Sequence, residues 1–93
     1  MFVLHVELQV KPELHKDLEE TFVGTFCPAI SQQAGFRGAK LLRPAEDGDY
    51  RLSIAFEDQA SQQKWVATDL HQVVWPRIES HCVTYSVKNF HAV

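Results

Sequence analysis

The 93-residue chain lacks the features that mark nucleic-acid-binding and membrane proteins. Its nine Lys and Arg residues are scattered, and its net charge of −3 offers no attraction for nucleic acid or for an anionic membrane surface. No apolar run is long enough to span a bilayer, and the N-terminus has neither a basic leader nor a small-residue cleavage site. We therefore expect a cytoplasmic protein with no nucleic-acid or membrane partner.

Cysteine and glycine are also scarce, which argues against several kinds of site. The two cysteines, Cys27 and Cys82, lie far apart without metal-like spacing. A structural disulfide is possible in principle, but two free buried thiols in a reducing compartment fit the sequence better. The stretch "GFRG" at 35–38 lacks the lysine of a phosphate-binding loop, and the chain has no nucleophile elbow or carboxylate dyad. We predict neither a metal site nor a cofactor.

Alternation of apolar and polar residues predicts four strands, at residues 2–11, 36–43, 50–57 and 82–90. Spacing of three to four residues predicts a helix over 13–34, kinked or interrupted by Pro28 and capped by Gly35, and a second helix from about 58 to 80. Thr68 and Asp69 can cap a new helix, and Pro76 is badly placed in a straight one. We expect a break at 68–69 or a kink near 72–76.

This order predicts a single domain over residues 1–93 with an α+β, ferredoxin-like βαββαβ fold. Its four-stranded antiparallel sheet would carry both helices on one face. The apolar residues of the first strand would face the helices, and the opposite sheet face would be mixed, with Val3, His5 and Glu7 among its side chains. Such a face is either solvated or packed on a second copy of the sheet. His5 and Glu7 are expected to be an interface or surface pair.

The stretch from Phe56 to His81 contains the most informative side chains, Trp65, His71 and Trp75. His71 and Trp75 are four residues apart and share a helix face, beside an apolar stripe formed by Val66, Leu70, Val73, Val74 and Ile78. Trp65 would point elsewhere on an unbroken helix, but a break near 68–69 would turn it toward the same cavity. Two indoles and one imidazole suit a pocket for a flat, partly polar ligand. From residue types alone, a core helix with a silent, hydrogen-bonded His71 is the commoner arrangement.

Three segments in order resemble the antibiotic biosynthesis monooxygenase (ABM) superfamily of dimeric α+β barrels. They are "VELQVKPE", "QQAGFRGAKLLRP" and, most specifically, "YRLSIAFEDQASQQKWVATDLH". The resemblance implies a homodimer with two sheets packed face to face and one pocket per subunit between sheet and helices. It matches Trp65 to the family's helix Trp and His71 to its frequent helix His.

Enzymes of this superfamily oxidise polycyclic phenols with molecular oxygen and no metal or flavin, degrade haem, or act on small quinols or aldehydes. Other members have no known activity. Two departures stand out in this chain. The first strand lacks the asparagine that faces the pocket in many members, and Trp75 occupies the position of the iron-ligating histidine of haem degraders.

Two functions follow from the resemblance and the residues. One is a cofactor-independent, monooxygenase-like enzyme for a small aromatic or quinol compound, with His71 as the general base. Trp65 and Trp75 would stack on the substrate. Phe22, Phe26 and Tyr85 could complete the wall, whereas Arg51 is expected to face away. The alternative is a non-catalytic dimeric domain of the same fold that binds a small molecule or has a structural role.

Overall fold

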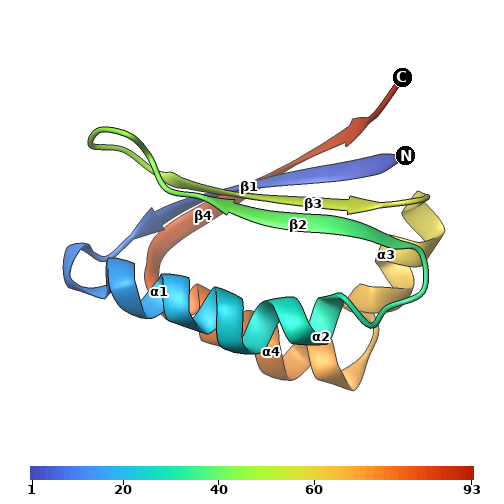
Figure 1. Cartoon of the computed structure of the whole chain (residues 1–93), viewed down its shortest axis with the longest axis horizontal. Helices are drawn as coiled ribbons and strands as arrows, with labels where there is room; N and C mark the ends of the chain where they lie inside the picture. The colour runs from blue at the N-terminus through green and yellow to red at the C-terminus, as the bar shows by residue number, and fades with distance from the viewer.

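The computed structural model describes all residues from 1 to 93 and contains one antiparallel sheet with every helix on the same face (Figure 1). The strands are β1 (Phe2–Val10), β2 (Phe36–Leu42), β3 (Tyr50–Phe56) and β4 (Cys82–His91). They lie in the order β2-β3-β1-β4. The predicted ferredoxin-like layout is confirmed. No helix is both long and apolar enough to span a membrane.

The first helical region runs through four segments that follow one another without a loop. They are η1 (Pro12–Leu14, a 3-10 turn), α1 (His15–Thr21), η2 (Phe22–Phe26, a π-helix) and α2 (Cys27–Ile30). Pro28 has no N–H to donate to the preceding turn. The helix meets this loss with a wider turn, in which the Cys27 N–H donates to the Phe22 carbonyl five residues back. The α-helix is therefore interrupted by a π-helical segment, which is one of the two effects predicted for Pro28.

Gly35 is not the helix cap that the sequence suggested. The helix ends at Ile30 with Ser31 after it, and Gly35 lies in the following turn with a left-handed φ of 78°. A Cβ at this position would lie 2.5 Å from the Ser61 Oγ atom. Glycine is therefore required both by the backbone conformation and by the close approach of the next helical region.

The core lies between the sheet and the helices. Along β1 every second residue is buried, as the alternation predicted. The largest side chains with almost no exposure come from both layers, which shows that strands and helices share one core; they are Leu8, Leu18, Phe26, Ile30, Tyr50, Leu52, Phe56 and Ile78. Both cysteines are free thiols, and burial raises the pKa of each.

The second helical region is divided into α3 (Gln59–Val66) and α4 (Asp69–Glu79), with the break at the predicted place. Because the two helices are turned relative to each other, the predicted apolar stripe is not continuous. Val74 and Ile78 are buried, but Val66, Leu70 and Val73 are 38%, 40% and 54% exposed. The buried residue of α3 is Trp65 instead.

Thr68 holds the break between α3 and α4. Its backbone is extended, with φ −75° and ψ 151°, and its Oγ1 accepts a hydrogen bond from the His71 N–H at 3.1 Å. The same hydroxyl donates to the Trp65 carbonyl at 2.7 Å. The Thr68 side chain therefore caps the N-terminus of α4 and links it by a hydrogen bond to the last turn of α3.

The sheet face opposite the helices has the mixed character that the alternation predicted. Glu7 forms an ion pair with Arg51 on β3, its neighbour across the strands. His5 packs against the ring of Phe90 on β4, with ring centroids 5.0 Å apart, and lies directly opposite Lys88. His5 and Glu7 therefore lie on the open sheet face, and each contacts a cross-strand neighbour of its own.

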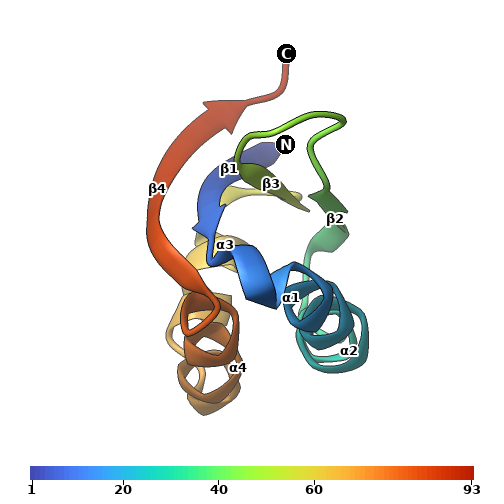
Figure 2. The same ribbon diagram turned by 90° about the vertical axis from the view of Figure 1, so that its left-hand side faces the viewer.

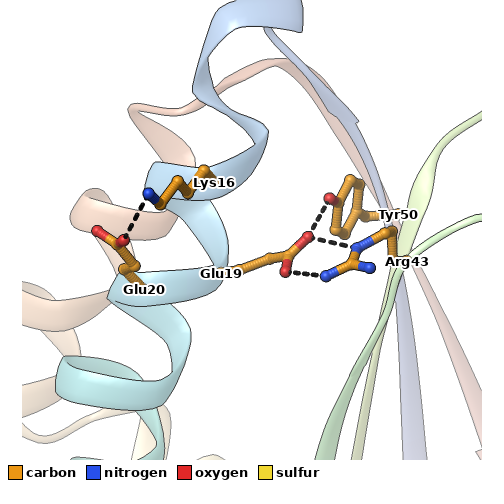
Figure 3. Close-up of polar contacts among 5 residues, drawn as sticks. All are labelled: Lys16, Glu19, Glu20, Arg43 and Tyr50. Atoms are coloured by element: carbon orange, nitrogen blue, oxygen red, sulfur yellow. Dashed lines mark hydrogen bonds and ion pairs between the residues drawn. The ribbon is translucent and has the colours of Figure 1, made fainter.

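A polar cluster connects α1 to the β2–β3 hairpin on the helix side of the sheet (Figure 3). The carboxylate of Glu19 accepts hydrogen bonds from both the Arg43 guanidinium, with a Nε–Oε2 distance of 2.7 Å, and the Tyr50 hydroxyl. The Arg43 hydrogen bonds and then that of Tyr50 lower the pKa of Glu19 to about 2. The neighbouring pair, Lys16 and Glu20, is much looser at 4.0 Å and highly exposed.

The Glu19 cluster predicts a specific loss of stability in acid. A carboxylate whose pKa is about 2 in the folded protein and 4.5 in the unfolded chain stabilises the fold fully above pH 4.5. This contribution declines as the pH falls toward 2. Glu19→Gln should therefore lower the midpoint of urea denaturation at pH 7. Between pH 4.5 and 2.5, the midpoint of this variant should fall less than that of the native protein. Glu20→Gln is the control, and equal acid profiles for both variants would contradict the prediction.

The Thr68 cap predicts a second change in stability. Thr68→Ala removes the acceptor of the His71 N–H and should lower the free energy of unfolding by about 1 kcal/mol, whereas Thr68→Ser keeps the hydroxyl and should stay close to the native value. Urea denaturation followed by circular dichroism measures both variants. A serine variant as unstable as the alanine variant would show that the hydroxyl is not what holds the break.

Candidate functional site

A cavity of about 260 Å³ lies between the sheet and the helices, beneath β1, β3 and β4. The inward-facing residues of β1 and β3 cover it on the sheet side, and residues of α3, α4 and β4 form its sides. Figure 2 shows β4 curving down toward α4. Ten of the thirteen lining residues are hydrophobic: Leu4, Val6, Phe26, Ile54, Phe56, Trp65, Val66, Trp75, Tyr85 and Val87. The three polar ones are Gln62, His71 and Asn89. Such a pocket suits a small, largely apolar ligand.

The aromatic side chains of this pocket form a connected set around His71. The Trp65 ring meets the His71 ring edge to face, with centroids 5.1 Å apart and planes at 85°. The His71 and Trp75 rings are nearly parallel, with centroids 6.5 Å apart. Trp75 in turn meets Tyr85 of β4 at 5.2 Å. The break at Thr68 thus brings Trp65 to His71, as the sequence suggested that it could.

Five of the six predicted site residues line this cavity, and Phe22 does not. Phe26 lines it and also contacts Trp65, with ring centroids 6.2 Å apart. Phe22 stacks on Phe26 from the other side and borders the shallow hollow near Glu19 and Arg43. Four-residue spacing placed both phenylalanines on one stripe, but a stripe along a helix extends past the end of the pocket. Arg51 faces the opposite side of the sheet, as expected, in its pair with Glu7.

His71 is half-buried, and no Asp, Glu, Lys or Arg lines the cavity with it. Burial lowers the pKa of His71 below its ordinary value of 6.5. The imidazole is therefore neutral at pH 7, and one ring nitrogen can accept a proton. A neutral imidazole in an apolar pocket is a chemically competent general base.

The pocket has one imidazole, that of His71, and it lies between the rings of Trp65 and Trp75. The cavity volume falls just below the usual range of about 300–1,000 Å³ for ligand pockets. No three side chains of His, Cys, Asp or Glu gather as a set of metal ligands.

Two polar lining residues, Gln62 and Asn89, were not among the predicted site residues. Asn89 belongs to the same alternating set on β4 as Tyr85, and it lies directly opposite Leu4 on β1. Gln62 comes one turn before Trp65 on α3. The alternation of β4 and the helical spacing of α3 can be seen in the sequence. Only the strand register and the helix break show that the two side chains reach one cavity.

Solved structures with the same fold cover almost the whole chain. SnoaB from Streptomyces nogalater, a cofactor-independent oxygenase solved in a mutant form, has a TM-score of 0.86 at 18% identity, over 98% of this chain and 91% of its own. Rv0793 from Mycobacterium tuberculosis has a TM-score of 0.81 at 11% identity, over 99% and 94%. A mutant form of MhuD, with two manganese protoporphyrin IX molecules bound per active site, has a TM-score of 0.78 at 20% identity, over 100% and 95%.

At these identities the likeness establishes the fold alone. No curated protein matches the chain significantly. The family model of the antibiotic biosynthesis monooxygenases, however, matches residues 1–75, which include β1, β2, β3, Trp65, His71 and Trp75. The chain belongs to the antibiotic biosynthesis monooxygenase family.

Proposed function

We propose that this protein is a cofactor-independent, monooxygenase-like enzyme that acts on a small aromatic or quinol compound. The observation that carries the proposal is the convergence of Trp65, His71 and Trp75 on one apolar cavity. Family membership supports monooxygenase-like chemistry, and SnoaB, which has the same fold, is a cofactor-independent oxygenase.

The size of the cavity indicates the size of the ligand. An apolar cavity of about 150 Å³ holds one benzene ring. A cavity of about 260 Å³ therefore matches one substituted ring or two fused rings. The faces and edges of the two indoles can pack on such a flat ligand.

In the proposed reaction, His71 takes a proton from a phenol or from an activated CH₂ group of the substrate. The resulting carbanion, or the electron-rich ring carbon of the phenolate, gives electrons to molecular oxygen, and a C–O bond forms at that carbon. The peroxide then takes the proton back from His71 to give a hydroperoxide. Loss of water from the hydroperoxide leaves a carbonyl group. The reaction balances as CH₂ + O₂ → C=O + H₂O, with one oxygen atom in the product and the other in water.

The proposed role of His71 predicts both a rate loss and a pH profile. His71→Ala should lower kcat/KM for oxygen uptake with a naphthol substrate by about 10²- to 10⁴-fold. Since the base must be neutral, activity should fall as the pH drops through the pKa of His71. Burial lowers this pKa, so the acid limb should have its midpoint below pH 6.5.

His15→Ala is the matched control, because His15 is exposed on α1 and contacts Tyr50 outside the pocket. Oxygen uptake that survives His71→Ala would remove this residue from the mechanism. A protein that binds bicyclic aromatics tightly but consumes no oxygen with any of them would favour the non-catalytic binding domain. The presence of a single imidazole and no carboxylate in the pocket is the feature that favours this second candidate.

The proposal includes a homodimer in which the open faces of two sheets pack together. On this face an apolar row crosses all four strands in register, formed by Gly38, Ala55, Val3 and Phe90. A second copy would remove this row from water, while the pair of Glu7 and Arg51 is already neutralised within each subunit.

A charge placed in this row should separate the subunits without unfolding them. Sedimentation equilibrium should give twice the chain mass of 10.6 kDa for the native protein and the single mass for Ala55→Glu. Gln63→Glu, on the exposed side of α3, should remain dimeric. A native protein that sediments as a monomer, or an Ala55→Glu variant that stays dimeric, would contradict sheet-to-sheet association.

A further inference from the structure

The side-chain amides and the imidazole of the cavity are gathered at one end of it. Figure 1 shows α3, the end of β3, the start of β1 and the end of β4 at the same end of the sheet. Gln62 lies on α3, His71 lies in the first turn of α4 next to α3, and Asn89 lies near the end of β4. Trp65 also lies on α3, and toward the other end Trp75 meets Tyr85, whose side chain carries a hydroxyl group.

The strand register gives the distance between the two ends of the cavity along β4. Tyr85 pairs with Leu8 and Asn89 pairs with Leu4, so the two β4 residues face the cavity four positions apart. At about 3.3 Å per residue, this separation is roughly 13 Å along the strand. A two-ring ligand aligned with β4 would therefore have an aromatic end and an end near amide groups.

Both amide groups are free to bind a ligand. No hydrogen bond within the chain involves the side chain of Gln62 or that of Asn89. Each carries an NH₂ group with two donors. In contrast, Gln72, one residue after His71, is occupied by a hydrogen bond to the Val66 carbonyl at 3.0 Å.

We infer that Gln62 and Asn89 form the oxygen-binding end of the pocket and donate hydrogen bonds to a carbonyl or phenolate oxygen of a bicyclic aromatic ligand. This assignment rests on the proposed function, because it places the oxygen on the same side of the pocket as the proposed base, His71. Asn89 is exposed at the rim of the apolar pocket and Gln62 is half-buried, so both amides can reach a ligand oxygen and donate to it. The two amides would therefore select ligands that carry an acceptor oxygen over plain hydrocarbons.

The test compares two ligands that differ in one oxygen atom. 1-Tetralone is a bicyclic aromatic ketone that can only accept hydrogen bonds, and tetralin is the same ring system without the carbonyl group. Isothermal titration calorimetry on the full chain would measure both ligands with the native protein, Gln62→Leu, Asn89→Leu and Asn89→Asp. Asn89→Asp keeps the shape of the side chain and removes its N–H donors. Gln63→Leu, on the exposed side of α3, is the control.

Each of the three pocket variants should weaken 1-tetralone binding by about 3- to 10-fold and leave tetralin binding within about twofold of the native value. Gln63→Leu should change neither. An equal loss for both ligands, or an unchanged affinity for 1-tetralone, would overturn the assignment while leaving the aromatic pocket intact. A native protein that binds neither ligand would contradict the proposed function itself, and this inference with it.

Discussion

The pocket depends on one interruption of a helix. If the chain from Gln59 to Glu79 were a single helix, the six-residue separation of Trp65 and His71 would put the two rings on different faces. The Thr68 hydroxyl, bonded to both the Trp65 carbonyl and the His71 N–H, stabilises the break that brings them together. Val66, Leu70 and Val73 near the break remain partly exposed, whereas Val74 and Ile78 of α4 join the core.

The proposed chemistry depends on the small number of polar side chains in the pocket. In water an imidazole is half-protonated near pH 6.5. Burial beside two indoles lowers the pKa of His71, so the imidazole is neutral at pH 7 and can accept a proton. Gln62 and Asn89 carry the only side-chain amides at the cavity, and we infer that they mark the end at which a ligand oxygen binds.

Much of this architecture could be predicted from the sequence. Alternation in β1 identified the buried face, and the Thr68–Asp69 signal located the helix break, because both depend on local patterns. The errors concern features set by tertiary contacts. Phe22 follows the same helical spacing as Phe26 but lies past the end of the cavity, and Asn89 reaches the cavity only because β4 pairs with β1 in a particular register. The partner of Glu7 was also missed, since Arg51 is its neighbour only across strands.

The central claim is that a small aromatic ligand enters the space between the two indoles and His71. Titration of ¹⁵N-labelled protein with 1-naphthol, followed by heteronuclear NMR, tests it most directly. The account predicts saturable shifts of the Trp65 and Trp75 indole N–H signals and of the His71 ring nitrogens, while the signals of Ser53 and Lys88 on the open sheet face stay unchanged. Indole signals that do not move at saturating 1-naphthol, or shifts confined to the open face, would contradict it.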